Sequence, residues 1–190
     1  MSSFVQIANA VAVHVGTEAR ITDPGDNRTL ARTVREVWDL NRRAALRDGK
    51  FDFAMRTVDL AALAGTVPGD WQSMFQEPAE SLRLVEVLTE GARDTYRHEG
   101  RVILCNVAGP LSVRVVVDVT EPALWDESFA EAFAARIAWR IGKRIAGSAY
   151  SEQAGEALYR SLISTAKKID AQQEPPIEQE ESDWITARFT

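Results

Sequence analysis

The chain has few of the side chains on which disulfide-bonded and metal-binding proteins depend. Its 190 residues include one cysteine, Cys105, and two histidines, His14 and His98. A lone cysteine excludes an intrachain disulfide and a thiolate metal cage. The sequence also has no helical histidine pair and no calcium-loop alternation of acids around a glycine. We therefore predict no structural metal and no cofactor, and we expect His14 to be a packing residue and His98 to be exposed.

Long hydrophobic runs are also missing. Every apolar run is far shorter than the roughly 18 residues needed to span a bilayer, and the N-terminus has no basic flank before a hydrophobic stretch. These absences predict a soluble, unsecreted protein without membrane contact. The 22 Lys and Arg residues are outnumbered by 28 Asp and Glu residues, which gives a formal charge of -6. That balance argues against a protein whose whole surface binds nucleic acid.

Catalytic motifs are absent as well. The sequence has no G-x-G-x-x-G after a strand, no G-x-S-x-G elbow and no complete phosphate loop around Asp48-Gly49-Lys50. The acids Glu121 and Asp126 lie where a helix is expected to begin, and carboxylates there complement the helix dipole. Cys105 lies in an apolar segment, where a thiol behaves as a small hydrophobe. The sequence therefore predicts that the protein is not an enzyme.

Helical periodicity is what the sequence does show. Apolar residues recur at steps of three or four in four segments, which span Phe4 to Val15, Arg28 to Arg47, Trp125 to Ile145 and Glu152 to Gln172. Asp26 and Ser151 can cap the second and fourth helices. For the fourth helix, the spacing predicts a buried face formed by Ala154, Leu158, Leu162, Ala166 and Ile169.

Between the second and third helices the period changes to that of strands. Three consecutive antiparallel strands are expected over 82–88, 101–107 and 111–119, with 51–58 as a plausible fourth. The interpretation places Trp71, Met74 and Phe75 over one edge or face of this sheet, and takes the segment 93–100 as an exposed turn. Residues 65–70 form a turn-rich loop.

These elements predict an α+β fold, an antiparallel helical bundle with an inserted small antiparallel β domain and an extended C-terminal tail. Residues 1–49 and 121–172 make the helical part, residues 50–120 the inserted β region and residues 173–190 the tail. The tail begins with Glu174-Pro175-Pro176 and carries an acidic run. It ends with three apolar residues that either fold back on the body or dock on another subunit: Trp184, Ile185 and Phe189.

The second helix has a basic face. Six arginines are opposed within the segment only by Glu36 and Asp39, a surplus of four positive charges; the arginines are Arg28, Arg32, Arg35, Arg42, Arg43 and Arg47. Such a face is either solvated and salt-bridged or a site that contacts phosphate groups.

The order of the segments resembles that of podophage tail tubular protein A, the head-to-tail adaptor or gatekeeper family. The opening run from Ala8 to Gly16 and the helix followed by Phe51-Asp52-Phe53-Ala54 look like the start of that family. The similarity continues through Trp71 to Pro78 before Leu82-Arg83-Leu84, Val113-Arg114-Val115 and Leu124-Trp125-Asp126. It ends with Phe129 in an alanine-rich helix, the break Gly147-Ser148, and a tail finishing in 183–188.

The resemblance implies a ring, typically of twelve subunits, between the portal protein and the tail nozzle protein, through which DNA passes without sequence-specific binding. It places the protein in the virion tail, after assembly in the host cytoplasm. Under this hypothesis Trp184, Ile185 and Phe189 dock on the portal. Subunit contacts would use Arg28, Arg35 and Arg42, because a basic lining in the channel would hold DNA strongly. Contacts to a neighbour or the nozzle would use Arg93, Tyr96, Arg97 and His98.

Two alternatives remain open at this point. The first is a cellular helical regulator that binds nucleic acid through the Arg28 to Arg47 face. The second is an enzyme that relies on substrate-assisted or backbone-only catalysis.

Overall fold

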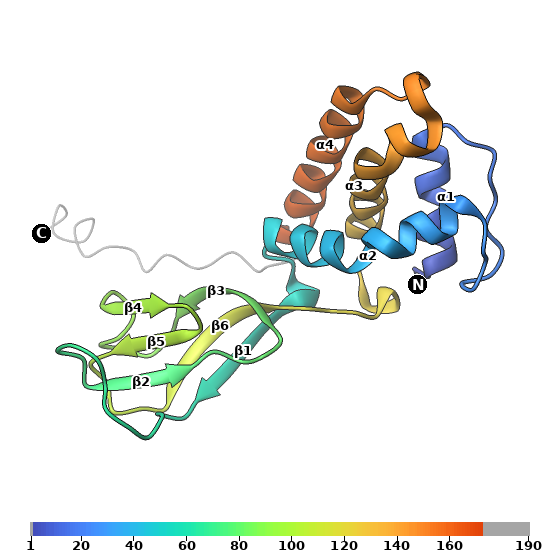
Figure 1. The fold of residues 1–190 in the computed structure, drawn as a ribbon. Coiled ribbons are helices and arrows are strands. Elements are labelled where there is room, and N and C mark those ends of the chain that lie inside the picture. Colours follow the sequence, from blue (N-terminus) through green and yellow to red (C-terminus); the bar gives the residue numbers. More distant parts are fainter. Residues whose placement is uncertain (1, 173–190) are drawn as a thin grey trace, which may run out of the picture.

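The α+β fold predicted from the sequence is confirmed in the computed structural model, which describes residues 2–172 (Figure 1). Within that range four α-helices form the helical part: α1 Phe4–Val15, α2 Thr29–Asp48, α3 Glu127–Ala146 and α4 Glu152–Ala171. Six strands lie between α2 and α3: β1 Met55–Leu60, β2 Ser73–Gln76, β3 Ser81–Val87, β4 Tyr96–Glu99, β5 Val102–Cys105 and β6 Leu111–Val117. Short 3-10 helices cover Asp52–Ala54, Pro122–Leu124 and Gly147–Ala149.

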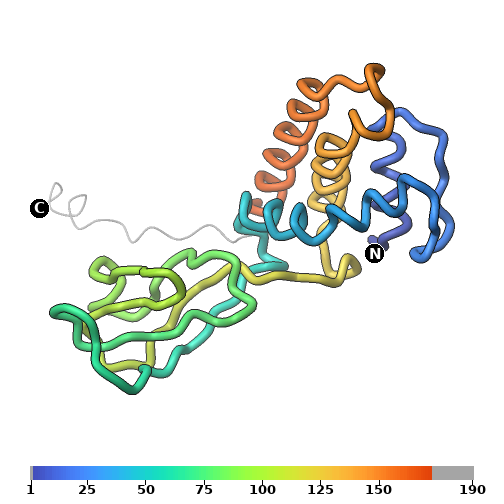
Figure 2. The backbone as a smooth tube through the Cα atoms, in the orientation of Figure 1, coloured from blue at the N-terminus to red at the C-terminus, as the bar shows by residue number. Residues whose placement is uncertain are grey.

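The helical part is arranged around α3, which packs against both α1 and α4, while α2 crosses it (Figure 1). The tube view shows the same arrangement, with the strands gathered at the other end of the molecule (Figure 2). Gly16 ends α1 with φ 77°, and its N–H donates to the carbonyl of Ala12, so the predicted stop is where the helix ends. The two halves of the helical part, separated in sequence by the strands, form one body.

An aromatic cluster forms the centre of the helical part. Phe133 and Phe129 of α3 are fully buried, and Trp38 of α2 lies with its ring centroid 4.9 Å from that of Phe133. The Trp125 ring lies 5.1 Å from Phe133, and its indole N–H donates to the carbonyl of Val119 over 2.9 Å. Trp125 belongs to the buried stripe as predicted, but it precedes the helix, which begins at Glu127.

The buried face predicted for α4 is correct for Ala166 and in part for Leu162, which packs against the core, but wrong for the rest. The buried residues of α4 are Gly155, Tyr159, Ile163, Ala166 and Asp170, whereas Ala154 is exposed, Leu158 is 39% exposed and Ile169 is 42% exposed. Polar contacts fix this rotation: the Tyr159 hydroxyl donates to Asp48 over 2.6 Å, and the Asp170 carboxylate accepts from the backbone N–H of Asp52 over 3.0 Å. The spacing of apolar residues does not reveal such polar contacts, so it cannot predict which face of α4 is buried.

The turn between α3 and α4 adds a steric reason for the rotation. The Tyr150 ring occupies the space that a side chain would need at Gly142 of α3 and at Gly155 of α4. A Cβ atom at Gly142 would lie 2.4 Å from the Tyr150 ring, and one at Gly155 would lie 2.0 Å from its hydroxyl. The two glycines therefore face each other across Tyr150, and Ser151 caps α4 as predicted by accepting from the N–H of Ala154.

The β part contains two three-stranded antiparallel sheets, ordered β1-β6-β3 and β2-β5-β4. The strands predicted over 82–88, 101–107 and 111–119 are confirmed as β3, β5 and β6, but the single sheet is wrong, because β3 and β5 belong to different sheets. The segment 73–76, expected to cover the sheet, is strand β2, and the segment 96–99, expected to be a turn, is strand β4. The first strand begins at Met55, since Asp52–Ala54 is a 3-10 turn.

Candidate functional site

The site residues expected from the sequence fall in three places. The arginines lie on α2 and just before it, and Tyr96, Arg97 and His98 lie on β4. Trp184, Ile185 and Phe189 lie outside the described residues. The geometry of the first two groups decides how much of each is available to a partner.

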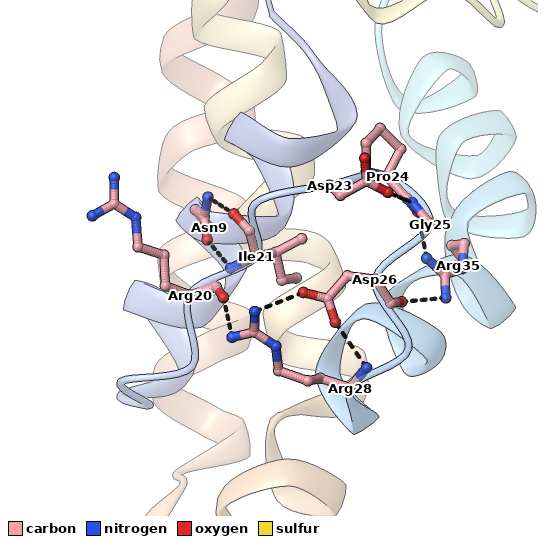
Figure 3. A network of polar contacts seen from close by, with 9 residues as sticks. All are labelled: Asn9, Arg20, Ile21, Asp23, Pro24, Gly25, Asp26, Arg28 and Arg35. Carbon is pink, nitrogen blue, oxygen red and sulfur yellow. Dashed lines mark hydrogen bonds and ion pairs between the residues drawn. The ribbon is translucent and has the colours of Figure 1, made fainter.

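Arg28 and Arg35 hold the loop that precedes α2 (Figure 3). The Arg28 guanidinium donates to the carbonyl of Arg20 and forms an ion pair of 2.9 Å with Asp26. The Arg35 guanidinium donates to the carbonyls of Pro24, over 2.5 Å, and Asp26, over 2.6 Å. Both side chains remain on the exposed surface of the molecule, but their donors are directed toward this loop.

The same loop is tied to α1 by Asn9. Its side-chain amide donates to the carbonyl of Ile21 over 2.9 Å and accepts from the N–H of Ile21 over 2.8 Å (Figure 3). Asp26 was expected to cap α2, but the N-cap residue is Arg28, which makes no side-chain cap bond. The Asp26 carboxylate instead accepts from the backbone N–H of Arg28 over 2.9 Å. Asp26 thus fixes the residue before the helix rather than its first turn.

Arg42 connects the helical part to the β part. It is 6% exposed and makes a two-pronged contact with Asp118, which follows β6: Nε to Oδ1 over 2.7 Å and Nη2 to Oδ2 over 2.9 Å. Nη1 also bonds to Asp39 over 2.5 Å. The hydrogen bonds that Arg42 donates to Asp118 raise the pKa of the guanidinium above its ordinary value, against the lowering effect of burial. Arg42 therefore contributes little exposed surface to a contact between subunits.

The remaining arginines of the face are open to solvent. Arg32, Arg43 and Arg47 are exposed, and Arg43 makes only a long bond of 3.5 Å to the carbonyl of Asp39. The basic face is thus divided: half of its six guanidiniums hold the chain together, and half remain available to an anion or to a neighbouring protein.

A second contact between the two parts lies at the end of α2. Arg83 of β3 donates to the carbonyls of Arg47 and Gly49, each over 3.0 Å. A cavity of about 370 Å³ opens there, lined by Asp48, Gly49, Lys50, Arg83, Lys167, Asp170 and Ala171. Helix carbonyls without an intrahelical partner favour cations at such an end, so the Arg83 contact stabilises the end of α2 and fixes the β part against it.

A polar cluster lies beside this cavity, between α2, α3 and α4. The Asp48 carboxylate accepts from the Tyr159 hydroxyl over 2.6 Å and from Arg136 over 3.0 Å, while Arg136 lies 5.0 Å from the centre of the Tyr159 ring. Burial, followed by the bond to Asp48, raises the pKa of the Tyr159 phenol well above its ordinary value. The phenol therefore stays protonated near neutral pH, where it acts as a hydrogen-bond donor and not as a base.

Strand β4 forms an exposed edge of the β part. All four of its side chains are exposed, as are residues 93–95 before it. Arg97 pairs with Glu99 over 2.6 Å, and the His98 ring lies 3.5 Å from the buried carboxylate of Glu77. The segment expected to be a contact turn is thus an edge strand, on which Arg97 is paired with Glu99 and the His98 ring is partly covered.

Sequence reasoning missed Asp118, Arg83 and Tyr159. A signal existed for Asp118, which follows a run of apolar residues in β6, because an acid so placed needs a cationic partner. Cys105 is buried in β5, and burial raises the pKa of its thiol. Within residues 2–172 no group of three His, Cys, Asp or Glu side chains is arranged to hold a metal ion.

The chain matches no protein-family model, and no curated protein matches it. None of the helices within residues 2–172 combines the length and the apolar character that a membrane span requires. A proposal about function therefore depends on the fold, the exposed surfaces and the resemblance described above.

Proposed function

We propose that this protein is a structural head-to-tail adaptor of a tailed phage. In this proposal copies of the chain form a ring between the portal and the tail nozzle, and DNA passes through the ring without sequence-specific binding. The protein would assemble in the host cytoplasm and remain in the virion tail. No catalytic step is assigned to it.

The observation that supports this proposal most is the way the two parts of the fold are joined. An adaptor has to hold two partners at a fixed distance, which requires a stiff connection between the surface for one and the surface for the other. The buried pair of Arg42 and Asp118 and the two bonds from Arg83 provide such a connection. The order of segments that carries the resemblance also agrees with the α+β fold that the chain adopts.

The proposal gives each exposed feature a task. Arg28 and Arg35 contact a neighbouring subunit, and the β4 edge with Tyr96, Arg97 and His98 contacts a neighbour or the nozzle. The tail residues Trp184, Ile185 and Phe189 dock on the portal, where an aromatic side chain in a pocket contributes strongly to binding. Copies acting together in a ring multiply that effect.

Negative-stain imaging of the purified full chain, with and without portal rings, tests the proposal. Rings that bind the portal are the expected result. A monomer or dimer that binds duplex DNA in a salt-sensitive way, and loses that binding on Arg32→Glu with Arg47→Glu, would contradict the adaptor and favour the nucleic-acid-binding regulator.

Portal docking by the tail has its own test. Truncation after Gln172 is expected to weaken co-sedimentation with portal rings while leaving the thermal melting temperature of the isolated protein unchanged, since all four helices end before that point. Equal co-sedimentation of the full and truncated chains would remove the tail from the portal contact. A large fall in the melting temperature would show that the tail packs on its own subunit.

A further inference from the structure

The outer face of α4 is uncharged along most of its length. Five exposed residues at steps of three and four form one line, which we term the α4 ridge: Ala154, Leu158, Ser161, Thr165 and Ile169. The Thr165 hydroxyl donates to the carbonyl of Ser161 over 3.0 Å, so its polar group is satisfied within the helix. Lys168 is exposed beside the ridge and has no acidic partner within the described residues. The ridge is therefore an apolar, small-residue surface with a positive charge at one side.

A groove with acidic residues, opposite in charge to Lys168, lies between α1 and α3. Its cavity of about 230 Å³ has an acidic rim, and we term it the α1–α3 groove; it is lined by Ser2, Gln6, Ile7, Ala10, Glu127, Ala130 and Glu131. Helix α1 contributes no Asp, Glu, Lys or Arg, but its His14 ring lies 2.9 Å from the Glu131 carboxylate, whereas Glu127 has no ion pair within the described residues. Beyond the groove, Val13 of the same helix is 75% exposed, which is unusual for a valine on a helix with such a buried inner face.

The ridge and the groove are separate surfaces of the chain. Both α1 and α4 pack on α3, and they lie on either side of it (Figure 1), so the ridge on α4 and the groove between α1 and α3 do not overlap. A surface that complements a different surface of the same chain gives a head-to-tail contact, which closes into a ring or continues as a filament. Isologous dimers would instead need one self-complementary patch.

We propose that the α4 ridge of one copy packs into the α1–α3 groove of the next copy, with Lys168 against the acidic rim of Glu127 and Glu131. This inference rests on the proposed ring and adds a contact between neighbouring copies to the one assigned to Arg28 and Arg35. Small residues on both sides, Ala154 and Ser161 on the ridge and Ala10 and Ala130 in the groove, allow two helices to approach closely. Charge complementarity favours a second copy as the partner, because each copy carries both the lysine and the glutamates.

Two single variants test the contact in the full chain. Leu158→Glu places a charge on the ridge, and Ala10→Glu places one in the acidic groove. Each is expected to weaken association at least about tenfold, because the contact would bury an unpaired charge. Sedimentation velocity gives the oligomeric state, and circular dichroism checks that helix content is unchanged. Leu40→Glu is the matched control, since Leu40 is 72% exposed on α2, outside both surfaces, and should leave assembly unchanged.

Mixing the two variants sharpens the test. Each retains one intact surface, so a head-to-tail contact predicts that the mixture forms a dimer while each variant alone is monomeric. A charge exchange adds a second readout: Lys168→Glu should weaken assembly, and Glu127→Lys in the same chain should restore it. Lys143→Glu, an exposed lysine near the end of α3, controls for net charge.

The outcomes separate this contact from the proposed function. Intact rings in both single variants would overturn the ridge and groove contact and leave the adaptor ring standing. A wild-type chain that stays monomeric even with portal would overturn the ring and this contact together. Rings in the wild type, monomers in each variant and dimers in the mixture support the contact.

Discussion

The helical part and the β part of this molecule differ in how their side chains pack and how far they are exposed. Every ring-to-ring contact within residues 2–172 lies in the helical part or at its junction with the β part. In the β part, by contrast, strand β4 has four exposed side chains and no interior face. The comparison indicates that aromatic packing stabilises the helical part, while the β part has an exposed strand edge.

Truncation of the aromatic core should have the largest effect on stability. Phe133→Ala is expected to lower the free energy of unfolding by about 3–5 kcal/mol. Phe75→Ala, at a fully buried residue of β2 that has no ring partner among residues 2–172, should cost less by roughly 1 kcal/mol, since aromatic pairs add that much beyond burial. Urea unfolding followed by circular dichroism measures both. Equal losses would break the comparison between the two parts.

Breaking the connection between the parts should come next. Asp118→Ala leaves the Arg42 guanidinium buried with only Asp39 near it, and should cost roughly 3 kcal/mol in the free energy of unfolding. The double variant Arg42→Met with Asp118→Leu removes both charges and should recover most of that loss. Urea unfolding again gives the values. A double variant as unstable as Asp118→Ala would show that the ion pair itself, and not the unpaired charge, decides the stability.

Tyr159→Phe should have a smaller effect that depends on pH. The lost hydrogen bond to Asp48 should cost about 1–2 kcal/mol near neutral pH. Because the folded phenol has a raised pKa, the unfolded chain loses this proton first as the pH rises past its ordinary value of 10.0. Wild-type stability should therefore fall above that pH, and the variant should lack this component of the fall. Thermal melts of both chains at increasing alkaline pH make the comparison; parallel curves would contradict it.

The smallest effect on stability should come from the edge of the β part. Arg97→Gln combined with His98→Gln on β4 should change the free energy of unfolding by less than about 1 kcal/mol, since these side chains are exposed and a surface ion pair such as that of Arg97 with Glu99 contributes little. Under the proposed function the same variant should weaken attachment to the nozzle, measured by co-sedimentation. Normal attachment would remove β4 from the contact residues.

Helical elements could be predicted from the sequence because their signals are local. The stripe through Phe129 and Phe133 and the stop at Gly16 depend on spacing and on one glycine. The orientation of α4 could not be predicted in this way, because Tyr159 and Asp170 fix it through bonds to residues more than 100 positions away.

Strand pairing was not predictable for a related reason. β6 pairs with both β1 and β3, and β5 pairs with β2 and β4, so only β4 and β5 are neighbours both in a sheet and in the sequence. The sequence predicts a turn at β4, because Tyr96–Glu99 lack the alternation of apolar and polar residues that marks a strand with one buried face. All four side chains of β4 are exposed, so no such alternation is required there. The sequence identifies the arginines of α2 as candidate site residues. It does not reveal that Arg42 bonds to Asp118, because the two residues lie 76 positions apart.

The central claim is that the chain forms a ring that joins a portal to a nozzle. Single-particle imaging of the full chain mixed with portal and nozzle proteins tests it most directly. The proposal predicts a closed ring of this chain between the two partners, with the helical part and the β part repeated around an open channel. Portal and nozzle particles that lack such a ring, with this chain remaining a free monomer, would contradict it.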